Sequence, residues 1–304
     1  MSLTHEIQVE FTQRSARIKS LDLHPVKPWI LVAQHSGMVE IWNYKLHRLE
    51  KSFVVTDNNL PVRSAKFIAQ KEWIVIGSDD KMIRVYDYNN EEKIKEFKGH
   101  EDYIRNIVVH PNQSYILSSS DDHLIKLWDW ENDWSCVRTF EGHSHYVMQL
   151  AINPIHDNMF ASVSLDGSFK IWNLQDSNPI ASMVAHEKGV NCVNYLTREN
   201  KLYLLTGSDD YTTKIWDSES LSCVTVLEGH TNNVNAILTH PDHPLIFTAS
   251  EDKTIRIWDA VTYQLVKTLD EGLGRVWAIQ IEKNSNQIMI GCDEGYLVGK
   301  IIIG

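Results

Sequence analysis

Short segments in which apolar and polar residues alternate follow one another along the whole chain. One stretch contains four of them in succession, at residues 103–111 (YIRNIVVHP), 114–120 (SYILSSS), 124–130 (LIKLWDW) and 135–140 (SCVRTF). Alternation over four to eight residues, bounded by turn residues, predicts β-strands rather than helices. The pattern therefore predicts an all-β protein built from units of four short strands.

An aromatic residue marks the third strand of each unit and recurs at a nearly constant interval. The intervals are 42 or 44 residues, and the residues are Trp42, Tyr86, Trp128, Trp172, Trp216 and Trp258. A repeat of this length made of short strands is typical of a β-propeller blade. A seventh unit fits residues 275–283, 287–293 and 296–303, with Lys300 at the aromatic position, and ends before its fourth strand.

The N-terminal segment EIQVEFTQ can supply that missing strand and close the ring, which would remove exposed sheet edges. We therefore expect residues 1–304 to form a single domain, a seven-bladed β-propeller.

Composition and motifs argue against several classes of function. The net charge of −11 argues against a nucleic-acid partner or an anionic membrane surface. Four widely spaced cysteines (Cys136, Cys192, Cys223 and Cys292) show no metal-binding spacing and indicate reduced thiols of a cytosolic protein. Neither a signal peptide nor a membrane-spanning run is recognisable, so direct membrane insertion is not expected. No phosphate loop, nucleophile elbow or metal triad appears, so we expect neither an enzyme nor a cofactor.

The recurring dipeptides resemble those of the WD-repeat family over the whole chain. The GH pairs are Gly99-His100, Gly142-His143 and Gly229-His230, with Ala185-His186 as a variant, and the WD pairs begin at Trp128, Trp216 and Trp258. In such blades a buried His, a Ser or Thr, an Asp and the Trp bond to one another, because each buried polar group needs a partner. The residues expected to be structural are His100, His143, His186, His230, Asp80, Asp122, Asp166, Asp210 and Asp252, with Ser36 and Glu294 as variants.

A second residue, seven before each aromatic position, is acidic in five units although the turn does not require an acid. The residues are His35, Asp79, Asp121, Leu165, Asp209, Glu251 and Asp293. Strand topology places these turns on the face that carries the links between blades. They are expected to form an acidic arc at the mouth of the central channel, serving either a ligand or only a solvated rim.

Basic residues are expected on the same face, at the start of each innermost strand. The equivalent positions are Lys19, Arg63, Arg105, Met148, Asn191, Asn235 and Trp277, and Arg17 and Asp102 lie nearby in sequence. A cationic sector beside an anionic one suits a ligand with a carboxylate at one end and ammonium groups close by. The C-terminus of a polypeptide, preceded by lysines, is such a ligand.

Longer segments resemble the first propeller of the coatomer beta-prime family. They are RSARIKSLDLHPVKPWIL, PVRSAKFIAQKEWIVIGSDD, HEDYIRNIVVHP, WDWENDWSCVRTFEGHSHYVM and SDDYTTKIWDSESLSCVTVLEGH. The resemblance implies recognition of C-terminal dilysine signals (KKxx or KxKxx) on membrane-protein tails returned from the Golgi to the endoplasmic reticulum. It also implies a cytoplasmic protein, peripheral on Golgi membranes and vesicles, that joins other coatomer subunits through regions absent from this chain.

The same resemblance assigns roles to residues. Arg17 and Lys19 would bind the terminal carboxylate, supported by Arg63, with His35 beside the end of the tail. Asp102 and Asp121 would bind one lysine, and Asp79 and Asp209 the other.

Three alternatives stay open. His35 stands where beta-prime members can carry Tyr, and HSG resembles the related alpha subunit of coatomer. A ubiquitin-ligase substrate receptor is a second alternative, although no Arg follows three residues after the aromatic, as a WDxR motif requires: the residues there are Lys45, Asn89, Glu131, Gln175, Glu219 and Val261. A general interaction scaffold is the third. A phosphopeptide reader fits less well, because the acids would repel phosphate.

Overall fold

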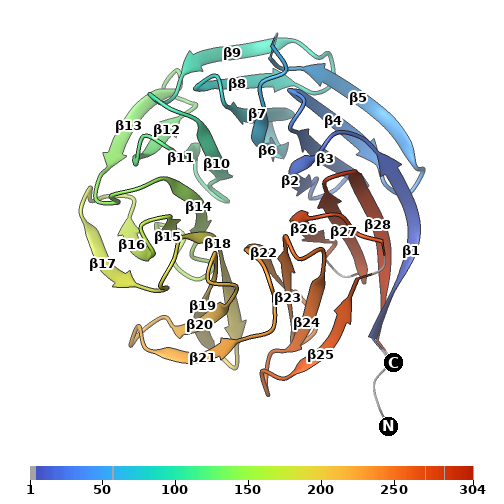
Figure 1. Cartoon of the computed structure of the whole chain (residues 1–304). Helices are drawn as coiled ribbons and strands as arrows, with labels where there is room; N and C mark the ends of the chain where they lie inside the picture. The colour runs from blue at the N-terminus through green and yellow to red at the C-terminus, as the bar shows by residue number, and fades with distance from the viewer. Residues whose placement is uncertain (1–4, 57, 271, 284, 304) are drawn as a thin grey trace.

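The computed structural model describes residues 5–56, 58–270, 272–283 and 285–303, without the side chains of 5–9, 297 and 300–303. Its strands form seven antiparallel four-stranded sheets arranged around a central opening, in sequence order from blue to red in Figure 1. The sequence prediction of an all-β, seven-bladed propeller is confirmed. Within the described residues the one helical segment is a 3-10 turn, η1 (Ala69–Lys71), and no helix there is long and apolar enough to cross a membrane.

Each blade runs from an innermost strand outward. Blade one is β2 (Ile18–Leu23), β3 (Trp29–Gln34), β4 (Met38–Asn43) and β5 (Arg48–Val54); blade two is β6 (Val62–Ile68), β7 (Trp73–Ser78), β8 (Met82–Asp87) and β9 (Lys93–Lys98). Blade three is β10 (Ile104–Val109), β11 (Tyr115–Ser120), β12 (Ile125–Asp129) and β13 (Ser135–Phe140); blade four is β14 (Val147–Ile152), β15 (Met159–Ser164), β16 (Ser168–Asn173) and β17 (Pro179–Val184). Blade five is β18 (Val190–Arg198), β19 (Lys201–Ser208), β20 (Thr213–Asp217) and β21 (Cys223–Leu227); blade six is β22 (Val234–Thr239), β23 (Leu245–Ser250), β24 (Ile255–Asp259) and β25 (Leu265–Leu269). Blade seven is β26 (Val276–Ile281), β27 (Gln287–Cys292), β28 (Gly295–Ile303) and β1 (His5–Arg14).

The N-terminal strand closes the ring, as the sequence predicted. Strand β1 pairs antiparallel with β28, from His5 opposite Ile303 to Arg14 opposite Gly295, and lies on the outside of blade seven (Figure 1). Because β1 and β28 come from opposite ends of the sequence, their hydrogen bonds join the first residues to the last blade. Pairing also covers the edge that β28 would otherwise expose.

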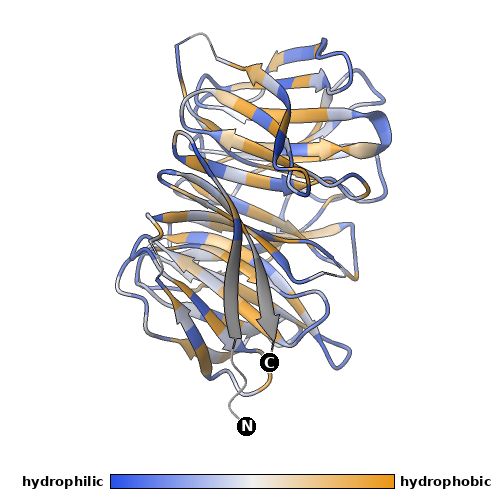
Figure 2. Ribbon diagram, turned by 90° about the vertical axis from the view of Figure 1, so that its right-hand side faces the viewer, coloured by the Kyte–Doolittle hydropathy of each residue, from blue (hydrophilic) through white to orange (hydrophobic). Residues whose placement is uncertain are grey.

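Burial along the strands explains the packing of the blades. The second strand of each blade is nearly all buried, as in β3 and β11, because both of its faces contact neighbouring blades. The outer strand β9 (KIKEFK) is mostly exposed and charged, which suits a sheet edge that faces water. Figure 2 shows apolar positions concentrated in the strands and polar positions in the loops.

The innermost strands are also joined side chain to backbone around the channel. The Asp22 carboxylate accepts the Phe67 N–H at 2.9 Å, and equivalent bonds join Asn106 to Leu150 at 3.1 Å and Gln149 to Val193 at 2.8 Å. Each bond links residues 44 or 45 positions apart, one repeat of the sequence. These half-buried amide and carboxylate groups therefore hold adjacent blades in register.

A buried polar network recurs in blades three to six. In blade three the Trp128 indole N–H donates to Ser118 Oγ at 2.9 Å, and Ser118 Oγ lies 2.7 Å from His100 Nε2. The other ring nitrogen, His100 Nδ1, lies 2.9 Å from Asp122 Oδ2. The corresponding sets are His143, Asp166, Ser162 and Trp172; His186, Asp210, Thr206 and Trp216; and His230, Asp252, Thr248 and Trp258.

Blade two builds a different version of this network, because no GH histidine precedes it. Arg84 reaches Asp80 at 2.6 Å and donates to Ser78 Oγ at 3.1 Å, and Ser78 in turn bonds to Asp80 at 2.6 Å. An arginine from the third strand thus takes the place of the histidine. The aspartate six residues before the aromatic is a hydrogen-bonded turn residue in both versions.

Candidate functional site

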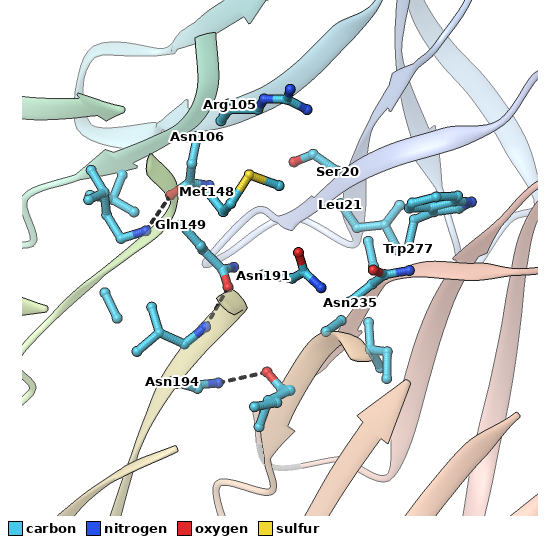
Figure 3. Close-up of a pocket in the computed structure, with 18 of the residues that line it drawn as sticks. Ser20, Leu21, Arg105, Asn106, Met148, Gln149, Asn191, Asn194, Asn235 and Trp277 are labelled. Atoms are coloured by element: carbon cyan, nitrogen blue, oxygen red, sulfur yellow. Dashed lines mark hydrogen bonds between the residues drawn. The ribbon is translucent and has the colours of Figure 1, made fainter. Parts of the chain in front are cut away.

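A cavity of about 400 Å³ lies on the propeller axis, lined by the innermost strand of every blade. All seven positions predicted to ring the channel mouth line it: Lys19, Arg63, Arg105, Met148, Asn191, Asn235 and Trp277. Figure 3 shows Met148, Asn191 and Asn235 directed into the opening, with Arg105 and Trp277 at its margin. The sequence repeat therefore places seven different side chains at one level of one channel.

The acids of the turns are bonded to these channel residues within the same blade. Arg63 binds Asp79 through two hydrogen bonds of 2.5 and 2.7 Å, and Arg105 binds Asp121 through two of 2.5 and 2.6 Å. Both aspartates are only 5% exposed. In blade five, Asn191 donates to Asp209, which is half-buried, at 2.7 Å.

This pairing corrects one sequence expectation. Asp79 and Asp121 were expected to form an anionic sector beside a cationic one, whereas each acid is bonded to the arginine of its own blade, so the two sectors interleave. The reason is geometric, because the turn and the start of the innermost strand lie at the same end of one sheet. A constant spacing of 16 residues within both pairs was the sequence signal for this contact.

Four basic residues, Arg17, Lys19, His35 and Arg63, gather at the mouth in blades one and two, and we refer to Arg17, Lys19 and Arg63 as the mouth cations. The His35 N–H donates to the Arg17 carbonyl at 2.8 Å, which places the blade-one turn against the start of β2. Burial, with Arg17, Arg63 and Lys19 nearby, lowers the pKa of His35 below its usual value. The resemblance assigned all four to carboxylate binding, and the structure brings them together.

Lys19 occupies an unusual position among the mouth cations. Its Nζ lies 3.6 Å from the centre of the Trp277 ring, and no described residue forms an ion pair with it. Burial, together with the charges of Arg63 and Arg17, lowers the pKa of Lys19 to about 7. A desolvated ammonium beside guanidinium groups gains from a bound anion, because an anion supplies the charge that the surroundings lack.

The residues that the resemblance assigned to binding the peptide lysines differ in whether they already form an ion pair. Asp102 is half-buried, accepts the Tyr103 N–H at 2.8 Å, and forms no ion pair with a described residue. It lies beside the Asp121 turn, since the Asp121 N–H donates to the Tyr103 carbonyl at 3.0 Å. Asp102 and Asp121 therefore lie together, but Asp121 is already occupied by Arg105.

Sequence reasoning did not single out Tyr103, Tyr146 or Arg275 at this site, and it gave Asp293 no partner. The Tyr103 ring lies 5.7 Å from the Arg63 guanidinium, and the Tyr146 ring lies 5.5 Å from that of Arg105. Asp293 contacts Arg17, Arg275 and Trp277. The 16-residue spacing between Trp277 and Asp293, the same as between Arg63 and Asp79, could have indicated the last contact.

Among the described residues no group of three or more His, Cys, Asp or Glu side chains could hold a metal ion. The GH histidines are each bonded to an aspartate and to a hydroxyl, so both ring nitrogens are engaged. What the site offers chemically is a set of hydrogen-bond donors and charges around an open cavity.

Comparison with known proteins places the protein in a family. A family model described as "WD domain, G-beta repeat" matches residues 50–87, 91–129, 134–173, 177–217 and 221–259. Coatomer subunit beta'-1 of Arabidopsis thaliana is 57% identical over 301 residues, and coatomer subunit beta' of Homo sapiens is 50% identical over 301. These matches cover 99% of this chain but only 32% and 33% of the relatives, so the chain spans about a third of their length. The chain therefore belongs to the WD-repeat family, and over nearly its whole length it is similar to part of the coatomer beta' subunits.

Proposed function

We propose that this propeller is the cargo-binding domain of a coatomer beta'-type subunit and binds C-terminal dilysine signals of membrane proteins. The observation that carries the proposal is the group of mouth cations, in which Lys19 lies half-buried without an acidic partner among the described residues. A terminal carboxylate is an anion of suitable size, and charge-assisted bonds from arginine and lysine are the usual way to hold one. The names of the relatives support a coatomer subunit of beta' rather than alpha type.

In this proposal the tail lies across the channel mouth. Arg17 and Lys19 bind the carboxylate, and Arg63 and His35 border it. An extended peptide advances about 3.3 Å per residue, so a lysine three or four residues from the C-terminus lies roughly 10–13 Å away. That distance suits a span from blade one to the side of the channel formed by blades three to five.

The carboxylates proposed to bind the lysines of the peptide differ in whether they are already bonded to other side chains. Asp102 is the principal partner, because among the described residues it accepts the Tyr103 N–H but forms no ion pair. Asp121, Asp79 and Asp209 would share their charge with Arg105, Arg63 and Asn191, respectively. We infer modest affinity, on the order of micromolar, from few and partly exposed ion pairs.

The similarity to coatomer beta' subunits supports a wider proposal about cellular role. In this proposal the protein acts in the cytoplasm, peripheral on Golgi membranes and transport vesicles, in traffic from the Golgi to the endoplasmic reticulum. Its partners are cargo tails and other coatomer subunits, the latter through regions outside this chain. Binding rather than catalysis is the proposed activity, with neither a cofactor nor a nucleic acid involved.

Calorimetric titration with an N-acetylated dilysine peptide, as the free acid and as its C-terminal amide, tests the proposal. Losing charge-assisted bonds costs roughly 1.5–3 kcal/mol each, so Arg17→Ala with Lys19→Ala should weaken the free acid more than about tenfold. The amide should bind the unmutated protein as weakly as the free acid binds this variant. Replacing both peptide lysines by serine should also abolish binding.

A matched control removes two cations from the outer strand β5. The Arg48 side chain is 63% exposed and that of Lys51 is 26% exposed, and they pair with Glu50 and Glu91 away from the channel. Arg48→Ala with Lys51→Ala should leave peptide affinity unchanged. If the amide bound as tightly as the free acid, the carboxylate site would be disproved.

A further inference from the structure

Asp293, in the turn between β27 and β28, has more partners than the equivalent acids of blades two and three. Its Oδ1 accepts the Trp277 indole N–H at 2.9 Å and Arg17 Nε at 2.7 Å, and its Oδ2 accepts Arg275 Nε at 2.8 Å. Arg17 belongs to blade one, so this carboxylate joins the last blade to the first. Although burial opposes it, the bonds from Arg275 and Trp277 hold the pKa of Asp293 below its usual value.

Asp293 has more partners than Asp79 and Asp121 because a different residue type stands at the channel position of its blade. Asp79 and Asp121 each receive two bonds from one arginine of their own blade. In blade seven the channel position is Trp277, whose indole offers a single N–H. The remaining acceptor capacity of Asp293 is therefore available to a residue of the neighbouring blade.

Trp277 has a second contact, through the face of its ring. The Lys19 ammonium lies 3.6 Å from the ring centre, and the Arg17 guanidinium carbon lies 5.1 Å from it. A ring face attracts a cation most strongly where water is excluded. The indole therefore supports Lys19 while its edge is fixed by Asp293.

We propose that Asp293 and Trp277 are the positioning residues of the carboxylate site: Asp293 orients Arg17 and the indole, and the indole face holds the Lys19 ammonium at the channel mouth. This inference rests on the proposed function and names two residues that set its preference for a free carboxylate. Neither residue needs to contact the peptide. The ring closure between blades seven and one then also assembles the binding site.

The variant Asp293→Ala removes the charge together with Oδ1, which accepts both Arg17 Nε and the Trp277 indole N–H, so it separates positioning from simple charge neutralisation, because the two roles predict opposite results. If Asp293 only neutralised the mouth cations, removing its charge would strengthen anion binding. If it positions Arg17 and Trp277, the free-acid peptide should bind about threefold to tenfold more weakly, the loss expected for one or two hydrogen bonds. Binding as tight as in the unmutated protein, or tighter, would overturn the inference.

Two substitutions of Trp277 distinguish the contribution of the indole N–H from that of the ring face. Trp277→Phe keeps a ring beneath Lys19 and loses the N–H, so the free acid should bind about threefold more weakly. Trp277→Leu also loses the ring face and should reduce the ratio of free-acid to amide affinity further. A purely structural defect would weaken both peptides together and leave their ratio unchanged. An unaltered ratio in Trp277→Leu would therefore also overturn the inference.

Trp130→Phe is the matched control. The Trp130 indole N–H, in blade three, is buried and has no hydrogen-bond partner among the described residues, so the same substitution removes no bond to any of them. Its affinities should equal those of the unmutated protein, and thermal melts should establish that all variants are folded.

A further measurement does not depend on dilysine peptides. Sodium acetate should shift the indole N–H NMR signal of Trp277, identified by its loss in Trp277→Phe, and Asp293→Ala should abolish the acetate response. If the unmutated protein fails to distinguish free acid from amide but shows this response, the proposed function fails while the positioned anion site stands. An acetate response that survives in Asp293→Ala would contradict the positioning role.

Discussion

Replacing Asp122 by alanine should destabilise the propeller, and the structure gives the size of the effect. The carboxylate accepts the N–H groups of Glu101 at 2.9 Å and Leu124 at 3.0 Å, and lies 2.9 Å from His100 Nδ1. Its side chain is only 8% exposed. Alanine would leave these donors without an acceptor, at ~1–3 kcal/mol for each one that water cannot reach.

The lowered pKa of Asp122 provides a second estimate of how much this carboxylate contributes to the free energy of unfolding. Although burial opposes it, the bond with His100 and the backbone N–H groups lower the pKa of Asp122 to about 2. Relative to ~3.9 in an unfolded protein, at about 1.4 kcal/mol per pH unit, this shift corresponds to roughly 2–3 kcal/mol. Because the folded pKa is depressed, this stability is present above about pH 4 and is lost as pH falls toward 2. The two estimates agree.

Replacing the neighbouring Asp121 by alanine provides a comparison for the loss of stability in Asp122→Ala. Because the turn does not require an acid at this position, the sequence pattern implies that Asp121→Ala would be nearly neutral, but the Asp121 side chain is 4% exposed and bonded twice to Arg105. Breaking a buried pair costs about 3–5 kcal/mol, and the Arg105 side chain, which is 18% exposed at the cavity, should bring this nearer to 2. Asp121→Ala combined with Arg105→Ala should recover part of the loss.

Equilibrium unfolding in urea, at pH 7 and again between pH 5 and pH 2, measures these quantities. At pH 7 Asp122→Ala should lower the free energy of unfolding by about 2–3 kcal/mol, and the difference from the unmutated protein should shrink in acid. An unchanged midpoint for Asp122→Ala at pH 7 would refute the network argument. A double variant at 121 and 105 that is less stable than either single variant would refute the pairing argument.

Three further predictions concern other parts of the molecule. Because the pKa of Lys19 is lowered to about 7, affinity for an N-acetylated free-acid peptide should fall about tenfold between pH 6 and pH 8, and Lys19→Arg should flatten the profile in calorimetric titrations. A profile that stays steep in Lys19→Arg would assign the titration to another group. Arg84→Ala should lower the free energy of unfolding by about 2 kcal/mol, measured in urea, because it leaves Asp80 without its ion pair; no change would mean that Ser78 alone satisfies the acid. Deleting residues 1–14 should expose the edge of β28 and cause self-association in size-exclusion chromatography, and a stable monomer would show that the paired strand β1 is dispensable.

The architecture of the propeller could be predicted from the repeat pattern alone. Its constant repeat predicted seven blades, and a last unit one strand short predicted that the N-terminus completes it, as the pairing of β1 with β28 confirms. The residues of the polar networks in blades three to six were equally readable. Each network lies within one repeat or at its junction with the preceding one, so a fixed spacing in the sequence corresponds to a fixed distance in space.

Which charges are available at the channel mouth could not be predicted in this way, because it depends on contacts between distant residues. Arg17 and Asp293 are 276 residues apart in sequence and meet because the ring closes between blades seven and one. The depressed pKa of Lys19 arises from burial and from cations that three different blades contribute, Arg17, Arg63 and Arg105. Asp79 and Asp121 are neutralised within their own blades, at the 16-residue spacing, by arginine side chains that reach the turn. A repeat pattern fixes where backbones pass, whereas pairing between blades and desolvation depend on distances that exist only once the ring has closed.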